Sequence, residues 1–431
     1  MRKILIFSFL LIMGLILSQI IPAISNYNVE FYSHIIKILT MIALGFIMIH
    51  VGYEFDIDKS NLRQYGWDYL IAATAAAFPW IFCAVYFVFF LSAYQPNQWD
   101  AWKESLLAAR FAAPTSAGIL FSMLIAAGLG ATWIFKKIRI LAIFDDLDTV
   151  LLMIPLKMMI VGLRWQLAVI IIVMLILLWF AWRYLHTVKI PITWPWVLTY
   201  AAAIALTCEL IYFSSKQIDE IVPIHIEVLL PAFVLGCMIA RAHSDASNQS
   251  AQSAPAHHDD ILETPKEKRV ATIVSCIFML LVGLTMPPII GIAGDAESVR
   301  QADQDIARAY TIPETTKPEI PTPEITPEPE MSWSSIILHV IFITILSNLG
   351  KMFPALCYRR QARWQERLAV AIALFPRGEV GAGVLIISLS YSIGGPMITV
   401  AMLSLALNLL CTGFFIVMVK RLIGPNPTPA L

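Results

Sequence analysis

The chain has 431 residues, of which 58% are hydrophobic and 14% charged, and its mean hydropathy is +0.74. Soluble proteins average about 25% charged residues, so this composition excludes a soluble globular enzyme. Lysine plus arginine and aspartate plus glutamate number 30 each, so the net charge indicates neither a nucleic acid nor an acidic partner. The 6 cysteines occur singly, which excludes a disulfide framework and a zinc site.

Apolar segments follow one another along the chain, each close to the roughly 20 residues that a helix needs to cross the hydrocarbon layer. The expected spans are 3–22, 33–54, 67–94, 105–130, 138–163, 166–185, 194–214, 222–241, 270–291, 334–357, 367–392 and 396–419. The first span starts with Arg2 and Lys3, as a signal peptide would, but its apolar run is long and we expect a retained helix. The sequence therefore predicts an all-α polytopic membrane protein with about 12 transmembrane helices.

Basic residues at the ends of the spans predict the orientation, because lysine and arginine resist translocation. If the N-terminus lies inside, most of these residues face inward, among them Lys136, Lys137 and Arg139. With an even number of spans, both termini are then expected to be cytoplasmic.

Two polar inserts interrupt the apolar pattern. Residues 242–268 are rich in serine, alanine, histidine and charge, and we expect a flexible cytoplasmic loop. Residues 293–332 end in repeated proline and glutamate, which predicts an extended external loop that serves as a spacer or as a partner-binding arm. Residues 257–260, His-His-Asp-Asp, could bind a metal ion, but no further ligand accompanies them and we expect no metal site.

The fifth span carries three carboxylates, Asp145, Asp146 and Asp148, near the middle of an otherwise apolar helix. Neighbouring residues of a helix point about 100° apart, so Asp145 and Asp146 are expected to face different partners, whereas Asp148 shares a face with Asp145. Three buried anions cannot all stay charged without cations, so some must hold protons. Groups that take either a proton or a metal ion are what ion/proton exchange requires.

The tenth span supplies a cation, Lys351. One interpretation is that its side chain reaches back to the interface, as long basic side chains do. Arg359, the next basic residue, follows eight positions later, about 12 Å along the helix axis. Lys351 is therefore expected well inside the membrane, where a buried ion pair is favoured. Gly350 removes bulk beside it and lets another helix come close.

Two further spans are expected to be broken, at Pro114 in the fourth and at Pro376 in the eleventh, although either alone would also fit a simple proline kink. A break at membrane depth is tolerated where it lines a cavity or is buried in protein, and it exposes backbone carbonyls that suit ions. Spans three to five and ten to twelve each have the break in the middle and run in opposite directions. This predicts inverted repeats whose broken helices cross at the midplane.

Four motifs in this order resemble those of bacterial sodium/proton antiporters of the monovalent cation:proton antiporter superfamily, in the branch with paired aspartates. They are Ala142-Ile-Phe-Asp145-Asp146, Pro114-Thr115-Ser116-Ala-Gly118, Gly350-Lys351 and Pro376-Arg377-Gly378-Glu379-Val-Gly381. The resemblance covers nearly the whole chain outside the two inserts. Asp148 departs from the pattern, because a small or apolar residue is expected there, and it adds a proton site, changes the stoichiometry or bonds a hydroxyl.

The resemblance implies roles for these residues. Asp146 would bind a transient Na⁺ and protons alternately, and Asp145 would form a salt bridge with Lys351 when the cation is absent. Thr115 and Ser116 would complete the cation site at the break of the fourth span. Supporting roles would fall to Asp148, Arg377, Glu379, Pro114, Asn348 and Gly350.

The resemblance also implies a transport domain, residues 67–163 and 334–421, which slides against a dimerisation scaffold, residues 1–66 and 166–291. The expected function is exchange of cytoplasmic Na⁺ or Li⁺ for external protons in a homodimer of a bacterial inner membrane. The exchange is expected to be electrogenic, with no cofactor besides the transported Na⁺ and H⁺. Two alternatives stay open: a potassium/proton antiporter of the same fold, and a membrane-embedded, magnesium-dependent enzyme like the prenyltransferases.

Four charged residues of the spans have no assigned role. We expect Glu227 at the membrane interface, because it lies near the start of the eighth span. Arg110 and Lys157 are expected toward span ends or in local pairs, and Glu209 is left without an explanation.

Overall fold

The computed structural model describes residues 2–24, 29–55, 62–92, 94–130, 132–161, 165–218, 224, 226–240, 265–286, 331–390, 393 and 395–424. The regular structure in these ranges is helical, and an isolated β-bridge joins Val188 and Ile239. The prediction of an all-α polytopic membrane protein is confirmed.

Every predicted span corresponds to one helix or to consecutive shorter helices. The helices are α1 (Arg2–Ile24), α2 (Val29–Tyr53), α3 (Leu62–Phe90), α4 (Trp99–Ala108), the 3-10 helix η2 (Ala109–Ala112), α5 (Ala117–Ala126), α6 (Trp133–Val161), α7 (Trp165–Arg183), α8 (Trp194–Ile218), α9 (Leu229–Met238), α10 (Pro265–Leu284), α12 (Trp333–Gly350), α13 (Phe353–Leu356), α14 (Trp364–Ala373), α15 (Glu379–Ser390) and α16 (Gly395–Ile423). In the described part, 8 helical stretches are long and apolar enough to cross a membrane. The α6 helix is not one of them, although it is 29 residues long.

Three predicted boundaries differ from the structure. The α10 helix begins at Pro265, so the last residues of the expected loop 242–268 are helical, and the rest of that loop lies outside the described residues. The expected external loop 293–332 lies outside them too, apart from its last two residues. The eighth span, expected over 222–241, contains a described helix only from Leu229 to Met238, because residues 224, 226 and 227 before it are not helical.

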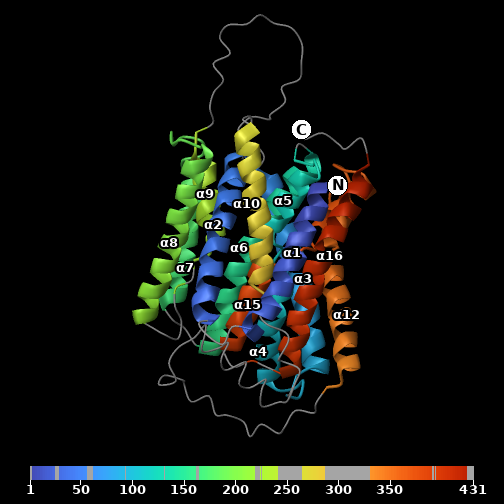
Figure 1. Cartoon of the computed structure of the whole chain (residues 1–431). Coiled ribbons are helices and arrows are strands. Elements are labelled where there is room, and N and C mark those ends of the chain that lie inside the picture. Colours follow the sequence, from blue (N-terminus) through green and yellow to red (C-terminus); the bar gives the residue numbers. More distant parts are fainter. Residues whose placement is uncertain are drawn as a thin grey trace, which may run out of the picture.

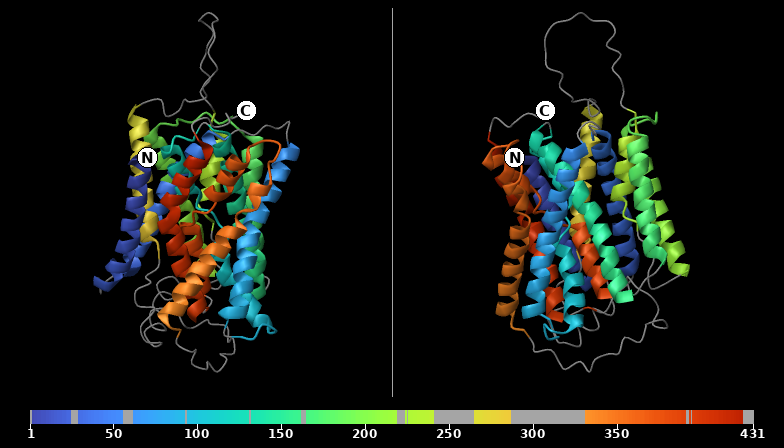
Figure 2. Two further views of the ribbon diagram at one scale, coloured as in Figure 1. Left: turned by 90° about the vertical axis from the view of Figure 1, so that its right-hand side faces the viewer. Right: turned by 180° about the vertical axis from the view of Figure 1, so that it is seen from behind.

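The helices stand side by side along one common direction, with α7 and α8 at one edge of the bundle and α12 at the opposite edge (Figure 1). The start of α1 and the end of α16 lie at the same end of the bundle (Figures 1 and 2). This placement is what an even number of crossings requires.

Two groups of helices pack internally. In one group α1 packs along α10, and α2 packs along α8 and α9; in the other, α3 packs on α6 and α12, and α16 on α12 and α14. Small residues allow the closest crossings, as is common in membrane proteins. A Cβ atom added to Gly283 would collide with the Leu11 carbonyl oxygen of α1, and one on Gly236 with the Ile49 carbonyl oxygen of α2.

The two predicted helix breaks are present. Residues 113–116 separate η2 from α5, and residues 374–378 separate α14 from α15. Proline lacks the N–H that a continuing helix needs and its ring clashes with the preceding turn, which explains why Pro114 and Pro376 lie inside the interruptions. Both breaks lie in the interior of the bundle, since the side chains of Thr115, Ser116 and Pro376 are buried.

Candidate functional site

The two interrupted helices contact each other through their unwound backbone. The Ser116 N–H donates a 3.0 Å hydrogen bond to the Pro376 carbonyl, and the Thr115 hydroxyl donates one of 3.0 Å to the Leu374 carbonyl. Backbone groups freed by a break at membrane depth must find partners inside the protein. The crossing supplies some of these partners and holds the two breaks together.

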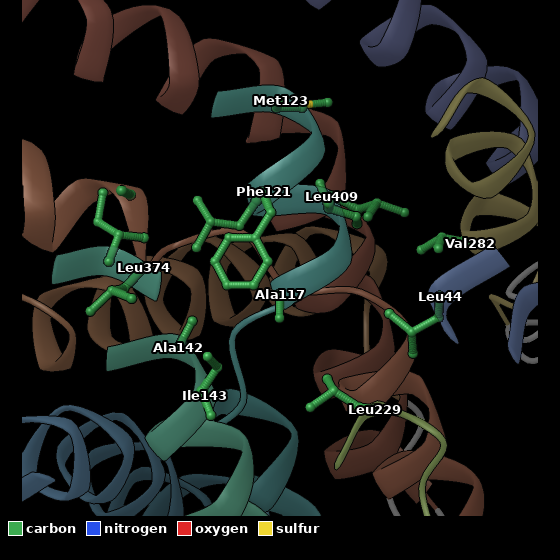
Figure 3. Close-up of a cluster of buried hydrophobic side chains, with 14 of the residues drawn as sticks. Leu44, Ala117, Phe121, Met123, Ala142, Ile143, Leu229, Val282, Leu374 and Leu409 are labelled. Carbon is green, nitrogen blue, oxygen red and sulfur yellow. The ribbon is translucent and has the colours of Figure 1, made fainter. Parts of the chain in front are cut away.

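Apolar side chains from several helices surround this crossing. Figure 3 shows Ala117, at the first turn of α5, with Leu44 of α2 and Val282 of α10 on one side and Leu374 on the other. All four side chains are buried. Polar groups at the crossing therefore lie in a low-dielectric setting, where electrostatic interactions are stronger than in water.

Lys351 and Asp145 form a buried ion pair at the crossing. The Lys351 Nζ atom lies 2.8 Å from Oδ2 and 3.1 Å from Oδ1 of Asp145, and both side chains are buried. Lys351 is the C-cap residue of α12 and is fully enclosed, so its side chain does not reach the interface. Gly350 makes this position accessible, because a Cβ atom there would collide with the Pro79 backbone of α3.

Thr115 joins this ion pair to the break of the fourth span. Its backbone N–H donates a 2.8 Å hydrogen bond to Asp145 Oδ2, and its hydroxyl oxygen accepts one of 3.1 Å from Lys351 Nζ. Isolating a buried charge costs several kcal/mol, so a buried pair needs such additional hydrogen bonds. A cation arriving here would meet one carboxylate, one hydroxyl and exposed backbone carbonyls, which are all oxygen ligands.

Asp146 faces a different direction from Asp145, as the helical rotation predicts. It lines a cavity of about 30 Å³ between α6, α7 and the residues at the start of α9. This volume is enough for one particle of the size of a water molecule. The two aspartates therefore lie next to each other in sequence but belong to two different surroundings, an ion pair and a cavity.

Asp148 and Arg110 lie beside the aspartate pair. Asp148 Oδ1 accepts a 2.8 Å hydrogen bond from the Tyr69 hydroxyl, one of the arrangements expected for this departure from the family pattern. Arg110 is not at a span end: it is fully buried in η2, its guanidinium lies 4.9 Å from the Trp80 ring centroid, and Nη2 donates to the Asp148 carbonyl at 3.0 Å. Sequence reasoning missed Tyr69 and Trp80 of α3, since no spacing rule connects this helix with Asp148 and Arg110.

Arg377 holds three segments together. Its Nε donates to the Ala112 carbonyl at 3.0 Å, Nη1 to Asn348 Oδ1 at 2.9 Å, and Nη2 to the Ser347 carbonyl at 3.1 Å. It thus satisfies carbonyl groups at the end of η2 and near the end of α12, the helix that carries Lys351. Glu379 is the first residue of α15, and its side chain lies outside the described part of the structure.

Glu209 has a partner far from the site. Its carboxylate lies 3.0 Å from Lys37 Nζ, and this pair connects α8 with α2. The Lys37 Nζ atom also lies 4.9 Å from the Tyr212 ring centroid. These contacts give the intramembrane glutamate of α8 a structural explanation.

A comparison with known protein families gives one match that covers almost the whole chain. The family model described as sodium/hydrogen exchanger, transmembrane, matches residues 2–422. No curated protein matches the chain.

Proposed function

Because the chain belongs to the sodium/hydrogen exchanger family, which exchanges cations for protons and is a transporter family and not an enzyme class, we propose that it is an electrogenic sodium/proton antiporter. Membership removes the alternative of a magnesium-dependent membrane enzyme. The observation that carries the proposal is the Lys351–Asp145 ion pair at the crossing of two helix breaks, with Asp146 beside it in a cavity.

In the proposed cycle, Asp146 loses its proton and a desolvated Na⁺ binds in its place. Asp145, the Thr115 hydroxyl and the backbone around Ser116 supply further oxygen ligands. Cation and proton must exclude each other, because a site filled by both would abolish coupling. The cation replaces Lys351 as the counter-charge of Asp145, so Lys351 is released on loading. Lys351, once released, gives up the second proton, so two protons are exchanged for one Na⁺ and net charge moves across the membrane.

The transport domain, residues 67–163 and 334–421, is proposed to move against a scaffold of residues 1–66 and 166–291. The close backbone crossings of α1 with α10 and of α2 with α9 support a rigid scaffold, since packing at glycine leaves little room for sliding. We place the scaffold in the interface of a homodimer. We assign the protein to a bacterial inner membrane with both termini cytoplasmic, in line with the distribution of lysine and arginine.

The test is proton flux into proteoliposomes, followed by a pH-sensitive dye, with Na⁺, Li⁺ and K⁺ compared at equal concentration. We expect saturable flux with Na⁺ and Li⁺ that responds to an imposed membrane voltage. Proton flux with K⁺ but not with Na⁺ or Li⁺ would replace the proposal by the potassium/proton antiporter. Flux that does not change with the imposed membrane voltage would show electroneutral exchange.

A matched pair of variants ties the flux to the site. Asp146→Asn is expected to abolish it, whereas Asp100→Asn, which removes an exposed carboxylate paired with Lys103, is expected to leave it unchanged. Full flux in Asp146→Asn would overturn the assignment of the site.

A further inference from the structure

The cavity beside Asp146 holds a second carboxylate, Glu227. Apart from these two, the residues that line it are isoleucine, leucine, valine and methionine side chains. They come from three segments, namely α6, α7 and residues 226–230. An apolar cavity with two carboxylates strongly prefers a cation or protons over any other small solute.

Glu227 does not lie at the membrane interface, where the sequence placed it. It lines the same cavity as Leu147 and Met174, which are central residues of α6 and α7. The helix α9 begins only at Leu229, so Glu227 belongs to non-helical backbone at this depth. Irregular backbone inside a membrane protein is tolerated where it is buried or lines a cavity. An ionisable residue at such a depth is expected to take part in function.

The two carboxylates come from different groups of helices. Asp146 belongs to α6 of the proposed transport domain, whereas Glu227 precedes α9, which packs along α2 in the proposed scaffold. Glu227 is also the more accessible of the two, since it is partly exposed and Asp146 is buried. A cation that reaches Asp146 through this cavity passes between the two groups and meets Glu227.

We propose that Glu227 is a further residue of the transport reaction, which attracts the cation into the cavity and so raises the affinity with which Asp146 is loaded. The proposal rests on the proposed function above. The carboxylate of Glu227 stabilises a cation in the cavity in every cycle but does not itself take up and release the exchanged proton. Glu227 therefore determines the KM for the cation and leaves kcat nearly unchanged.

A purely structural role for Glu227 has a specific form here. Lys157 of α6 interacts electrostatically with Glu227, so the glutamate could serve only to balance this lysine. The two roles predict different outcomes when both charges are removed. If Glu227 only balances Lys157, the variant Glu227→Gln with Lys157→Met regains the KM of the wild type; if Glu227 attracts the cation, the KM stays high.

The experiment measures Na⁺-dependent proton flux in proteoliposomes at one fixed pH over a range of Na⁺ concentrations. For Glu227→Gln we expect a KM for Na⁺ about tenfold higher, equivalent to about 1.4 kcal/mol, with kcat within twofold of the wild type. Glu227→Asp, which keeps the charge, should stay closer to the wild type. Glu209→Gln is the matched control, because it also removes a glutamate of the scaffold that interacts with a lysine, but one that does not line the cavity.

Each outcome decides between the proposals. An unchanged KM in Glu227→Gln, or recovery in the double variant, overturns the role of Glu227 and leaves the antiport function intact. Absence of flux in the wild type with any of the three ions overturns both. Size-exclusion chromatography of each purified variant shows that it is folded before its KM is compared.

Discussion

Two buried lysine–aspartate pairs of the described chain have nearly the same geometry and very different surroundings. Lys351 lies 2.8 Å from Asp145, and Lys137 lies 2.8 Å from Asp68. In the second pair the other oxygen of Asp68 accepts a 2.7 Å hydrogen bond from Tyr358, and the Lys137 Nζ atom lies 5.0 Å from the same tyrosine ring. That pair joins intact helices, α3 and α6, to the segment between α13 and α14.

The difference lies in what can replace each partner. Asp68 is buried and contacts the side chains of Lys137 and Tyr358. Asp145 instead contacts the unwound backbone at Thr115 and lies next to Asp146, which lines a cavity. A buried ion pair is therefore not a functional site in itself. In the proposed function it becomes one when a second cation can take the place of the lysine, and Asp145 has the unwound backbone and the second carboxylate beside it that such a cation needs.

The largest expected effect is on transport. Asp146→Asn removes the carboxylate that we propose exchanges a proton for the cation and keeps the size of the side chain, so cation-driven proton flux should be lost while the protein remains folded. Flux in proteoliposomes and thermal unfolding in detergent measure the two properties. Asp68→Asn is the matched control on the other pair: it should lower the unfolding temperature and leave the flux per folded molecule at the level of the wild type.

Removing Lys137 should cost stability without changing transport. Lys137→Met leaves Asp68 buried without its counter-charge, and breaking a buried pair in this way costs about 3–5 kcal/mol. The free energy of unfolding should fall by this amount, with an unchanged dependence of flux on pH. A shifted pH profile in Lys137→Met would contradict the distinction between the two pairs.

Removing Lys351 should cost a similar free energy and also move the pH profile. Without the positive charge, proton binding to the neighbouring carboxylates becomes more favourable, so a higher pH is needed to free them for the cation. The rise of activity with pH in Lys351→Met should therefore begin at a higher pH than in the wild type. Flux measured at steps of pH tests this, and Lys137→Met serves as the control.

Two tyrosine hydroxyls give the smallest effects and again separate the two regions. Tyr358→Phe removes a buried hydrogen bond to the charged Asp68, which should cost about 1.5–3 kcal/mol. Tyr69→Phe removes the interhelical bond to Asp148 at the surface of the bundle, where Tyr69 is exposed, and such bonds in membrane proteins are worth about 0.6 kcal/mol on average, so the cost should stay below about 1 kcal/mol. Thermal unfolding compares the two, and a larger loss in Tyr69→Phe would contradict the assignment.

Much of the fold could be predicted from the sequence, because a helix that crosses the hydrocarbon layer must be apolar over a fixed length, and such segments can be recognised from hydropathy. The breaks at Pro114 and Pro376 were predictable for a similar reason, since proline acts on its own helix. The closeness of Lys351 to Asp145 follows from a general cost, because a lysine enclosed in an apolar span requires an anion nearby.

The remaining contacts depend on tertiary packing that no local pattern records. Arg377 bonds two carbonyl groups and an amide from distant segments, and Tyr358 reaches Asp68 across 290 positions of the chain. The position of Glu227 was wrong for a different reason. Hydropathy does not distinguish an apolar helix from apolar non-helical backbone, so the eighth span was assigned a helix that begins several residues too early.

Equilibrium binding of radioactive Na⁺ to the purified protein, measured over a range of pH, is the most direct test of competition at Asp146. If cation binding displaces protons, the apparent Kd should weaken by at least about tenfold for each unit that the pH falls, and by up to about a hundredfold where both protons are released, and Asp146→Asn should not bind. A Kd that stays constant with pH, or that is the same in Asp146→Asn, would contradict the proposed exchange.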